Sequence, residues 1–400
     1  MLQPEPVCLL IADISGYTRY LAGVELDHAQ DILADLIGTV VTALRPTFRL
    51  AKLEGDAAFV YAPAGALDAS LLLDTVERCY FGFRRRRRDV RQATSCPCNA
   101  CVRIPDLNLK FVVHHGMALR QRIAGREELL GSDVIVVHRL LKNEVVERLG
   151  IGAYALLTQA SVDAVAIDPA ELGMQPLTEG YEYLGEVGTW VHDLERRWGE
   201  EEARRRVFVT PAESWFTVSV ETTAPPQLAW EFLTAPGRRP SWQVGVTEVV
   251  LAESAGNRRA VGATNHCRHG AEGQVIEEIL DWRPYDYLTD RGTHETPDGL
   301  VKMLETIELE PTAAGTTINF RYAPPRTAKE RATMASLEPM YRGVFATRMA
   351  RLVELLDAET AARGAEGAEE PELPAPQADG VLASLAGLAR DAGAAAAGPR

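Results

Sequence analysis

Apolar residues in the first part of the chain are spaced as in a buried sheet with helices. Val7 to Ala12 form a continuous apolar run, which is typical of a strand buried on both faces. A helix is expected from Tyr17 to about Leu36, and two strand-like segments then flank a turn at residues 54–55. The order strand, helix, hairpin, helix, strand predicts an α+β unit with a ferredoxin-like sheet, in which the first and third strands are neighbours.

The pattern changes after residue 213, where strands predominate. A short helix with prolines at its start is expected at 225–233, and an apolar stripe predicts a long closing helix at 329–357, which Pro339 should kink or shorten. These positions indicate a second unit with a sheet and a terminal helix. The strand candidates are residues 215–221, 246–251, 261–266, 275–282, 285–289, 300–309 and 316–322.

Two segments lack these patterns and divide the chain. Residues 196–212 are charged and have no core spacing, which predicts a linker or a solvated helix. From residue 359 onward Ala, Gly, Glu and Pro predominate, and such a segment cannot bury enough surface to offset its ordering entropy. We therefore expect domains at 1–195 and 213–358, and a disordered tail at 359–400.

The composition of the chain argues against several classes of protein. The chain has 42 Lys and Arg residues against 56 Asp and Glu residues, a net charge of −14, whereas nucleic-acid binding needs a basic surface. No apolar run reaches the ~20 residues of a membrane span, and no basic segment precedes the run at 7–12 as in a secretory signal. Six cysteines are too few for a disulfide scaffold. We expect a cytoplasmic protein with reduced thiols and neither a nucleic-acid partner nor a membrane span.

Two aspartates occur at the ends of the expected neighbouring strands. Asp13 follows the first apolar run, and Asp56 opens the strand that returns from the hairpin. Both carboxylates would then lie at one edge of the sheet, near a helix start at Gly16 to Thr18 whose backbone N–H groups suit phosphate oxygens. Such a pair suits Mg²⁺ that bridges a polyphosphate. The alternatives are a helix N-cap for Asp13 and an ordinary turn for Asp56.

These segments resemble class III nucleotidyl cyclases over nearly all of residues 5–195, and a cyclase-like family of unknown function in particular. The resemblance implies two Mg or Mn ions held by Asp13 and Asp56, with Gly16 and Thr18 at the phosphates. The similar segments are residues 11–18 and 52–57, which correspond to the metal-binding motifs, 111–116, which correspond to the next strand, 131–140, which correspond to the transition-state segment, and 182–190, which correspond to the closing hairpin.

The same resemblance implies further roles. Lys52 and Glu128 fall where the family reads the purine, and a lysine there favours adenine. Arg139 falls where the family stabilises charge on the transferring phosphoryl group, although a surface position on a helix is an equal alternative. In that family the site forms between two chains, with metal ligands from one and Lys and Arg from the other. A purine nucleotide and a homodimeric partner are therefore implied.

The chain also departs from the family pattern. Ile135 replaces the transition-state asparagine, the lysine of the closing hairpin is absent near Tyr183 and Leu184, and Glu128 stands where Asp or Thr is usual. Each missing charge-stabilising donor costs ~10²–10³ in rate. Nucleotide binding with weak or lost turnover is the first expectation, and an active adenylate or guanylate cyclase is the alternative.

An insertion separates residues 80 and 111. Arg84 to Arg88 are five consecutive arginines, for which a solvated helix end is expected; phosphate attraction and a contact with the acidic tail are the alternatives. Cys96, Cys98 and Cys101 lie within six residues. A zinc site needs about four ligands, so that Cys79, His114 or His115 would have to complete it. A redox-reactive thiol cluster and inert packing are the alternatives.

The second unit resembles the START and polyketide-cyclase-like (SRPBCC) fold in its element order and at residues 229–233 and 262–266. The resemblance implies a cavity between a curved sheet and the last helix that binds a lipid or another apolar small molecule. Glu305 shares a strand face with Val301, Met303, Ile307 and Leu309. If this face points inward, burial raises the pKa of Glu305; a broken register or a position at the rim is the alternative.

Residues 265, 267 and 269 likewise alternate on one face, for which packing is expected. Taken together, the two resemblances predict a signalling protein in which a nucleotide-binding unit is coupled to a ligand-sensing cavity. The alternatives are an active cyclase, and a carrier or enzyme centred on the second unit.

Overall fold

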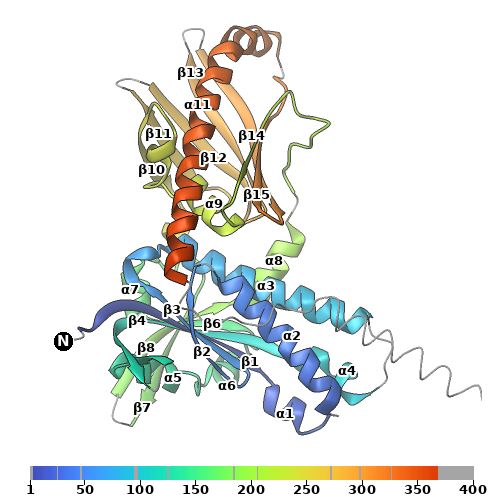
Figure 1. Cartoon of the computed structure of the whole chain (residues 1–400), viewed down its shortest axis with the longest axis vertical. Helices are drawn as coiled ribbons and strands as arrows, with labels where there is room; N and C mark the ends of the chain where they lie inside the picture. The colour runs from blue at the N-terminus through green and yellow to red at the C-terminus, as the bar shows by residue number, and fades with distance from the viewer. Residues whose placement is uncertain are drawn as a thin grey trace, which may run out of the picture. The chain divides into compact units, whose positions relative to one another are not determined.

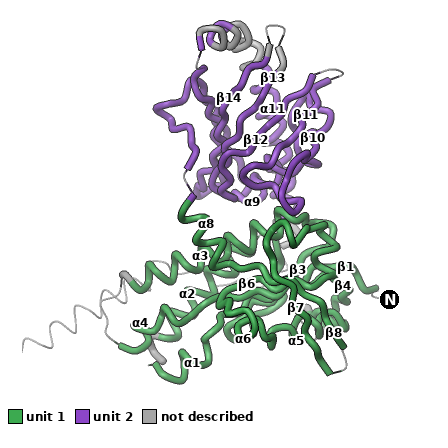
Figure 2. The backbone as a smooth tube through the Cα atoms, turned by 180° about the vertical axis from the view of Figure 1, so that it is seen from behind, with its two compact units in different colours: residues 1–203, 371–400 green, residues 204–370 purple. Residues whose placement is uncertain are grey.

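The computed structural model describes residues 3–24, 26–45, 47–93, 98–123, 126–182, 185–204, 206–270, 273–296, 299–325 and 327–367. They form two compact units, one up to Ala203 and one from Arg204 onward (Figure 2). None of the described helices is long and apolar enough to cross a membrane.

The first unit is an eight-stranded sheet with helices on both faces (Figure 1), in the order β2-β3-β1-β4-β6-β8-β7, with β5 paired to β4. Strands β4 and β6 are parallel and the other neighbours are antiparallel. The strands are β1 Glu5–Ser15, β2 Arg49–Glu54, β3 Ala57–Pro63, β4 Asn108–Ile123, β5 Arg126–Leu130, β6 Tyr154–Thr158, β7 Gln175–Tyr181 and β8 Gly185–Asp193. The helices are α1 Tyr17–Leu21, α2 Leu26–Leu44, α3 Ala69–Ala93, α4 Asn99–Val102, α5 Ser132–Arg139, α6 Val145–Leu149, α7 Gln159–Ala164 and α8 Leu194–Ala203.

Strand β1 is buried on both faces, as its continuous apolar run predicts. Leu10 and alternate residues face a core with α2 and α3, whereas Leu9 and its alternates face a second core with α5 and α6. Strand β1 pairs with β3 on one side and with β4 on the other. The prediction that the first and third strands are neighbours in the sheet is confirmed.

The helix expected from Tyr17 to Leu36 is interrupted. Helix α1 ends at Leu21 and α2 begins at Leu26, with Gly23, which a helix interior disfavours, between them. Gly16 caps α1 at a φ of +86°, and a Cβ there would lie 2.7 Å from the carbonyl oxygen of Asp106. The positive φ and the close approach of the Asp106 carbonyl oxygen therefore require glycine at position 16.

The arginine run differs from the expected solvated helix end. Helix α3 continues through it to Ala93, and Arg86 forms a bidentate pair with the buried Asp35 at 2.6 and 2.8 Å. Arg87 donates to the carbonyl oxygen of Leu107, and the Arg84 guanidinium lies over the Trp198 ring. Arg84, Arg86 and Arg87 therefore pack against other parts of the first unit instead of being fully solvated.

The second unit is an antiparallel sheet in the order β10-β11-β12-β13-β14-β15-β9, crossed by a long helix (Figure 1). Phe345, Met349 and Leu352 of that helix pack in one core with Phe320 of the sheet. This is the expected sheet with a terminal helix. The strands are β9 Phe216–Thr222, β10 Val246–Glu253, β11 Thr264–His269, β12 Gly273–Arg283, β13 Tyr287–Thr296, β14 Gly299–Thr312 and β15 Gly315–Tyr322, and the helices are α9 Pro226–Thr234, α10 Arg239–Trp242 and α11 Ala328–Gly367.

The structure differs from two expected boundaries. Residues 196–203, for which a linker or a solvated helix is expected, form most of α8, and this helix is not fully solvated because Trp198 packs against Phe81 of α3. Farther along, the backbone N–H of Val209 donates to Thr306 of β14. Helix α11 continues through position 339 and past residue 358 to Gly367, so that the first residues of the predicted tail are helical.

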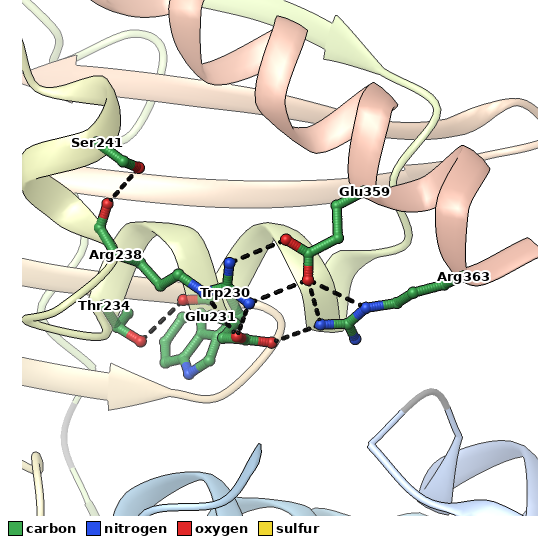
Figure 3. A network of polar contacts seen from close by, with 7 residues as sticks. All are labelled: Trp230, Glu231, Thr234, Arg238, Ser241, Glu359 and Arg363. Atoms are coloured by element: carbon green, nitrogen blue, oxygen red, sulfur yellow. Dashed lines mark hydrogen bonds and ion pairs between the residues drawn. The ribbon is translucent and has the colours of Figure 1, made fainter. Parts of the chain in front are cut away.

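Ion pairs between helices hold this extension of α11 (Figure 3). Arg238 pairs with Glu231 of α9 at 2.8 Å and with Glu359 of α11 at 2.9 Å. Arg363 pairs with the same two carboxylates at 3.2 and 2.6 Å. The alternating charges therefore connect the last turns of α11 to α9.

Candidate functional site

The two aspartates lie side by side, as the hairpin predicts: Asp13 is on β1, and Asp56 is the turn residue directly before β3. Asp13 of β1 is in register with Ala57 of β3, and the Ile14 N–H donates to the Asp56 carbonyl oxygen at 3.1 Å. Burial, followed by the nearby Asp13 charge, raises the pKa of Asp56 to about 6. This edge of the sheet therefore has an excess of negative charge.

Lys110 places one positive charge next to the two aspartates. It stands opposite Asp13 in the register of β1 and β4, and its Nζ lies 3.2 Å from Asp13 Oδ2 and donates to the Leu141 carbonyl oxygen at 3.1 Å. Sequence reasoning missed Lys110; the only signal is a lysine at the start of an apolar strand. Two carboxylates and one ammonium leave one net negative charge.

The donor chemistry of this edge fits Mg²⁺ or Mn²⁺, because both ions prefer carboxylate oxygens. Among the residues that the structure describes, no group of three or more His, Cys, Asp or Glu side chains is arranged to hold a metal. A metal ion held by Asp13 and Asp56 would need its other ligands from backbone, water or phosphate oxygens.

Lys52 and Glu128 are brought together, as their shared predicted role requires. Lys52 Nζ lies 3.8 Å from Glu128 Oε2 and 3.0 Å from Glu54 Oε1. Glu54 is also 3.0 Å from His138 Nε2. Burial alone would raise the pKa of Glu54, but the bonds from Lys52 and His138 lower it. Sequence reasoning missed Glu54 and His138, although Glu54 follows Lys52 by two residues on one strand face.

Arg139 lies at the end of α5 and is exposed. Within the described chain it forms no hydrogen bond or ion pair with Asp13 or Asp56. Ile135, one turn earlier, is 55% exposed. A shallow hollow follows this face of α5 and is lined by Val134, Ile135, His138, Arg139 and Lys142. Thr18 is exposed on α1, and this helix is only one turn long.

The residues that would have to complete a zinc site with the cysteine segment have other hydrogen-bond partners in the structure. Cys96 lies outside the described residues, Cys98 is half-buried and Cys101 is buried on α4. His114 lies 2.9 Å from the Thr158 hydroxyl, and His115 lies 3.2 Å from the Ser161 hydroxyl. The Cys79 thiol is directed to the Val40 carbonyl oxygen at 3.7 Å. These three candidate ligands are thus engaged in packing within the sheet and helices.

The second unit contains a cavity of about 360 Å³ between the sheet and α11. Its apolar lining includes Trp242, Ile279, Met303, Ile307, Phe320 and Phe345. Glu305 also lines it, and burial raises the pKa of this carboxyl to about 7. The inward-facing alternative for Glu305 is therefore the one observed.

Asn265 and His269, for which the sequence predicts packing, line this cavity, and sequence reasoning missed the other polar neighbours of Glu305. Arg239 of α10 donates to both carboxylate oxygens of Glu277 at 2.6 Å, and Asn265 donates to Glu277 at 3.5 Å. Tyr322 donates its hydroxyl hydrogen to Glu305. Asp290 is a further polar lining residue and stands opposite Glu305 in the sheet register. The cup is apolar in most of its lining but contains three carboxyl groups.

Family comparisons match both units. A family described as protein of unknown function (DUF2652) matches residues 33–148, and a family described as polyketide cyclase / dehydrase and lipid transport matches residues 215–357. The uncharacterized protein Rv2561/Rv2562 of Mycobacterium tuberculosis is 36% identical over 162 residues, which are 40% of this chain and 73% of that protein. The two family matches agree with the division of the chain after residue 203.

Several solved structures are also similar. The guanylyl cyclase Cya2 has 14% identity and a TM-score of 0.36, over 48% of this chain and 93% of that one. The adenylyl cyclase CyaB of P. aeruginosa has 13% identity and a TM-score of 0.37, over 52% of this chain and 100% of that one. Protein MLL2253 of Mesorhizobium loti has 19% identity and a TM-score of 0.28, over 34% of this chain and 95% of that one.

Proposed function

Since the chain belongs to the family of Rv2561/Rv2562 and joins a cyclase-like fold to a START-like domain, we propose that it is a nucleotide-binding sensor. In this proposal the first unit binds a purine nucleotide together with Mg²⁺ or Mn²⁺. The second unit binds an apolar small molecule or lipid in its cavity. Binding in one unit then changes the response of the other.

The observation that supports this proposal best is the charge at the edge of the first sheet. Asp13 and Asp56 are adjacent, and burial, followed by the nearby Asp13 charge, raises the pKa of Asp56. Lys110 neutralises one of the two charges. A divalent cation bound here supplies positive charge to the nucleotide phosphates. The two aspartates hold this cation, and Lys110 orients Asp13.

The purine and phosphoryl contacts are assigned to exposed side chains. Lys52 and Glu128 would bind the base, which requires Lys52 to exchange its contact with Glu54 for one with the nucleotide. Arg139 is exposed and separate from the carboxylates, which favours a role toward a second copy of the chain in a homodimer. Ile135 has no hydrogen-bonding group, so that weak turnover is expected at best.

Titration calorimetry of the full chain with ATP and GTP in Mg²⁺ or Mn²⁺ tests the first unit. We expect wild-type binding, and a loss of at least about tenfold in affinity for Asp13→Asn and for Asp56→Asn, since each removes a carboxylate ligand. Asp89→Asn, an exposed carboxylate on α3, is the matched control and should bind as wild type.

Two results would contradict the proposal. Equal binding by Asp13→Asn and wild type would remove the metal site, and absence of binding by wild type would leave a carrier or enzyme centred on the second unit. Accumulation of a cyclic purine monophosphate with Mn²⁺, abolished by Asp56→Asn, would instead establish an active cyclase.

The acidity of Asp56 predicts the pH dependence of metal binding. Because its pKa is about 6, a proton competes with the cation below that pH, and Mn²⁺ alone should bind roughly tenfold more weakly at pH 5 than at pH 7. The free energy of unfolding changes in the opposite sense, since a raised carboxyl pKa stabilises the folded state at low pH and this stabilisation is lost as pH rises through 6. Calorimetry at several pH values checks the first effect, and Asp56→Asn should flatten the profile.

A further inference from the structure

A row of polar side chains crosses the inward face of the second sheet. Asp290 of β13 is in register with Glu305 of β14, and Glu305 is in register with Tyr322 of β15. All three line the cavity. Residues directly opposite on one face have Cβ atoms about 4.5–5.5 Å apart. The two carboxyl groups therefore share one region of the cavity wall.

Asp290 is the member of this row without a partner. It is 7% exposed, and within the described part of the chain its carboxyl group forms no hydrogen bond or ion pair. Burial, followed by the charges of Glu305 and Glu277, raises the pKa of Asp290 well above its ordinary range. The Tyr322 hydroxyl donates to Glu305, which favours the ionised form of that carboxyl group. Asp290 is thus the group of the pair that holds a proton more firmly, since the pKa of Glu305 is about 7.

The charges of the cavity wall do not balance when all three carboxyl groups are ionised. Among the described lining residues the cations are Arg239 and Arg348, against Glu277, Asp290 and Glu305. Arg239 is occupied by its bidentate bond to Glu277, and Arg348 Nε donates to the Val244 carbonyl oxygen at 3.0 Å.

The histidines of the wall do not supply the missing charge. Burial lowers the pKa of His294 to about 4, and it also lowers that of His269. Both are neutral near pH 7. The wall is therefore one positive charge short, and the charge can come from a proton on Asp290 or from a ligand.

We propose that the cavity binds an apolar molecule that carries one protonated amine, and that Asp290 and Glu305 hold the ammonium group. The hydrocarbon part lies against Met303, Phe320 and Phe345. The cavity volume of about 360 Å³ is at the lower end of the range of ~300–1,000 Å³ that is usual for small-molecule sites. This inference rests on the proposed ligand-binding role of the second unit and is independent of nucleotide binding in the first.

Calorimetry of the full chain with octylamine and 1-octanol tests the proposal at pH 7. We expect octylamine to bind at least about tenfold more tightly than 1-octanol, because only the amine compensates the buried carboxylates. Binding of the cation displaces the proton of Asp290, so that about one proton should be released per amine. Heats measured in phosphate and in HEPES, which differ in ionisation enthalpy, give this number.

Asp290→Asn should lose the preference for the amine and the proton release, while it keeps the melting temperature because asparagine resembles the protonated acid. Glu278→Gln is the matched control, since Glu278 pairs with Arg291 at 3.2 Å and is half-exposed. It should bind as wild type. Equal affinity for octylamine and 1-octanol would overturn the charge proposal but leave the ligand-binding role. Failure of both probes to bind would overturn both.

Discussion

Replacement of Arg239 by methionine is expected to lower the free energy of unfolding of the second unit by about 3–5 kcal/mol, because it leaves the buried Glu277 without its cation. Both carboxylate oxygens of Glu277 accept bonds from Arg239 at 2.6 Å, and the Arg239 side chain is only 8% exposed. Four of the six tryptophans, at 215, 230, 242 and 282, lie in this unit. Urea unfolding followed by tryptophan fluorescence therefore measures the effect.

The deficit of this variant should depend on pH. In the native chain burial alone would raise the pKa of Glu277, but Arg239 holds it below its ordinary value. Without Arg239 the buried carboxyl group takes a proton more readily, so that the deficit should decrease as the pH falls. Arg239→Met with Glu277→Leu should recover most of the stability.

An exposed pair provides the control for this experiment. Arg268 pairs with Glu248 at 3.1 Å, but the Arg268 side chain is 70% exposed. Arg268→Met should cost less than about 1 kcal/mol. Equal losses for Arg239→Met and Arg268→Met would show that the buried pair has no special role in stability.

Replacement of Arg86 by methionine is expected to destabilise the first unit by about 3 kcal/mol or more, since Asp35 would remain buried without a partner. The Asp35 side chain is 4% exposed, and Arg86 Nε lies 2.6 Å from its Oδ2. Hydrogen exchange resolved by peptide should show faster exchange in α2 and α3. The measurement is made on the full chain, so that exchange in the second unit serves as an internal reference.

Arg88→Met is the matched control within the same arginine run. Arg88 is 54% exposed and lies 3.8 Å from an exposed Asp89, so that its loss should have little effect. Asp35→Asn combined with Arg86→Met should recover part of the stability, because a neutral side chain replaces the unpaired charge. If Arg86→Met and Arg88→Met behave alike, the arginine run is solvated as its composition predicts.

The sequence predicts those parts of the candidate site that depend only on which strands are neighbours. The run before Asp13 and the hairpin before Asp56 are both local signals, and together they place the two carboxylates at one edge. Lys110 could not be predicted in this way, because its position depends on the register between β1 and β4. The partner of Arg86 likewise depends on how α2 packs against α3.

The polar residues that line the cavity were not predicted from the sequence either, but for a different reason. The apolar pattern predicts a strand that ends at residue 289, one residue before Asp290, whereas β13 continues to Thr296. The continuation has polar residues on the inward face because this face lines a partly polar cavity. Strand prediction from apolar alternation assumes that inward-facing residues are apolar. It therefore leaves out the polar inward-facing residues, such as Asp290, that make this cavity partly polar.

The position of β1 between β3 and β4 has a consequence for the entropy of binding. Strand β1 pairs with a neighbour on each side, so that its backbone is fixed by the sheet and Asp13 is held in place before any ligand arrives. The long side chains of Lys52 and Arg139 are exposed, and each loses up to about 2 kcal/mol of rotamer freedom when it is fixed. For a nucleotide bound as proposed, the metal half of the site is thus preorganised, and the cost of ordering falls on the base and phosphoryl contacts.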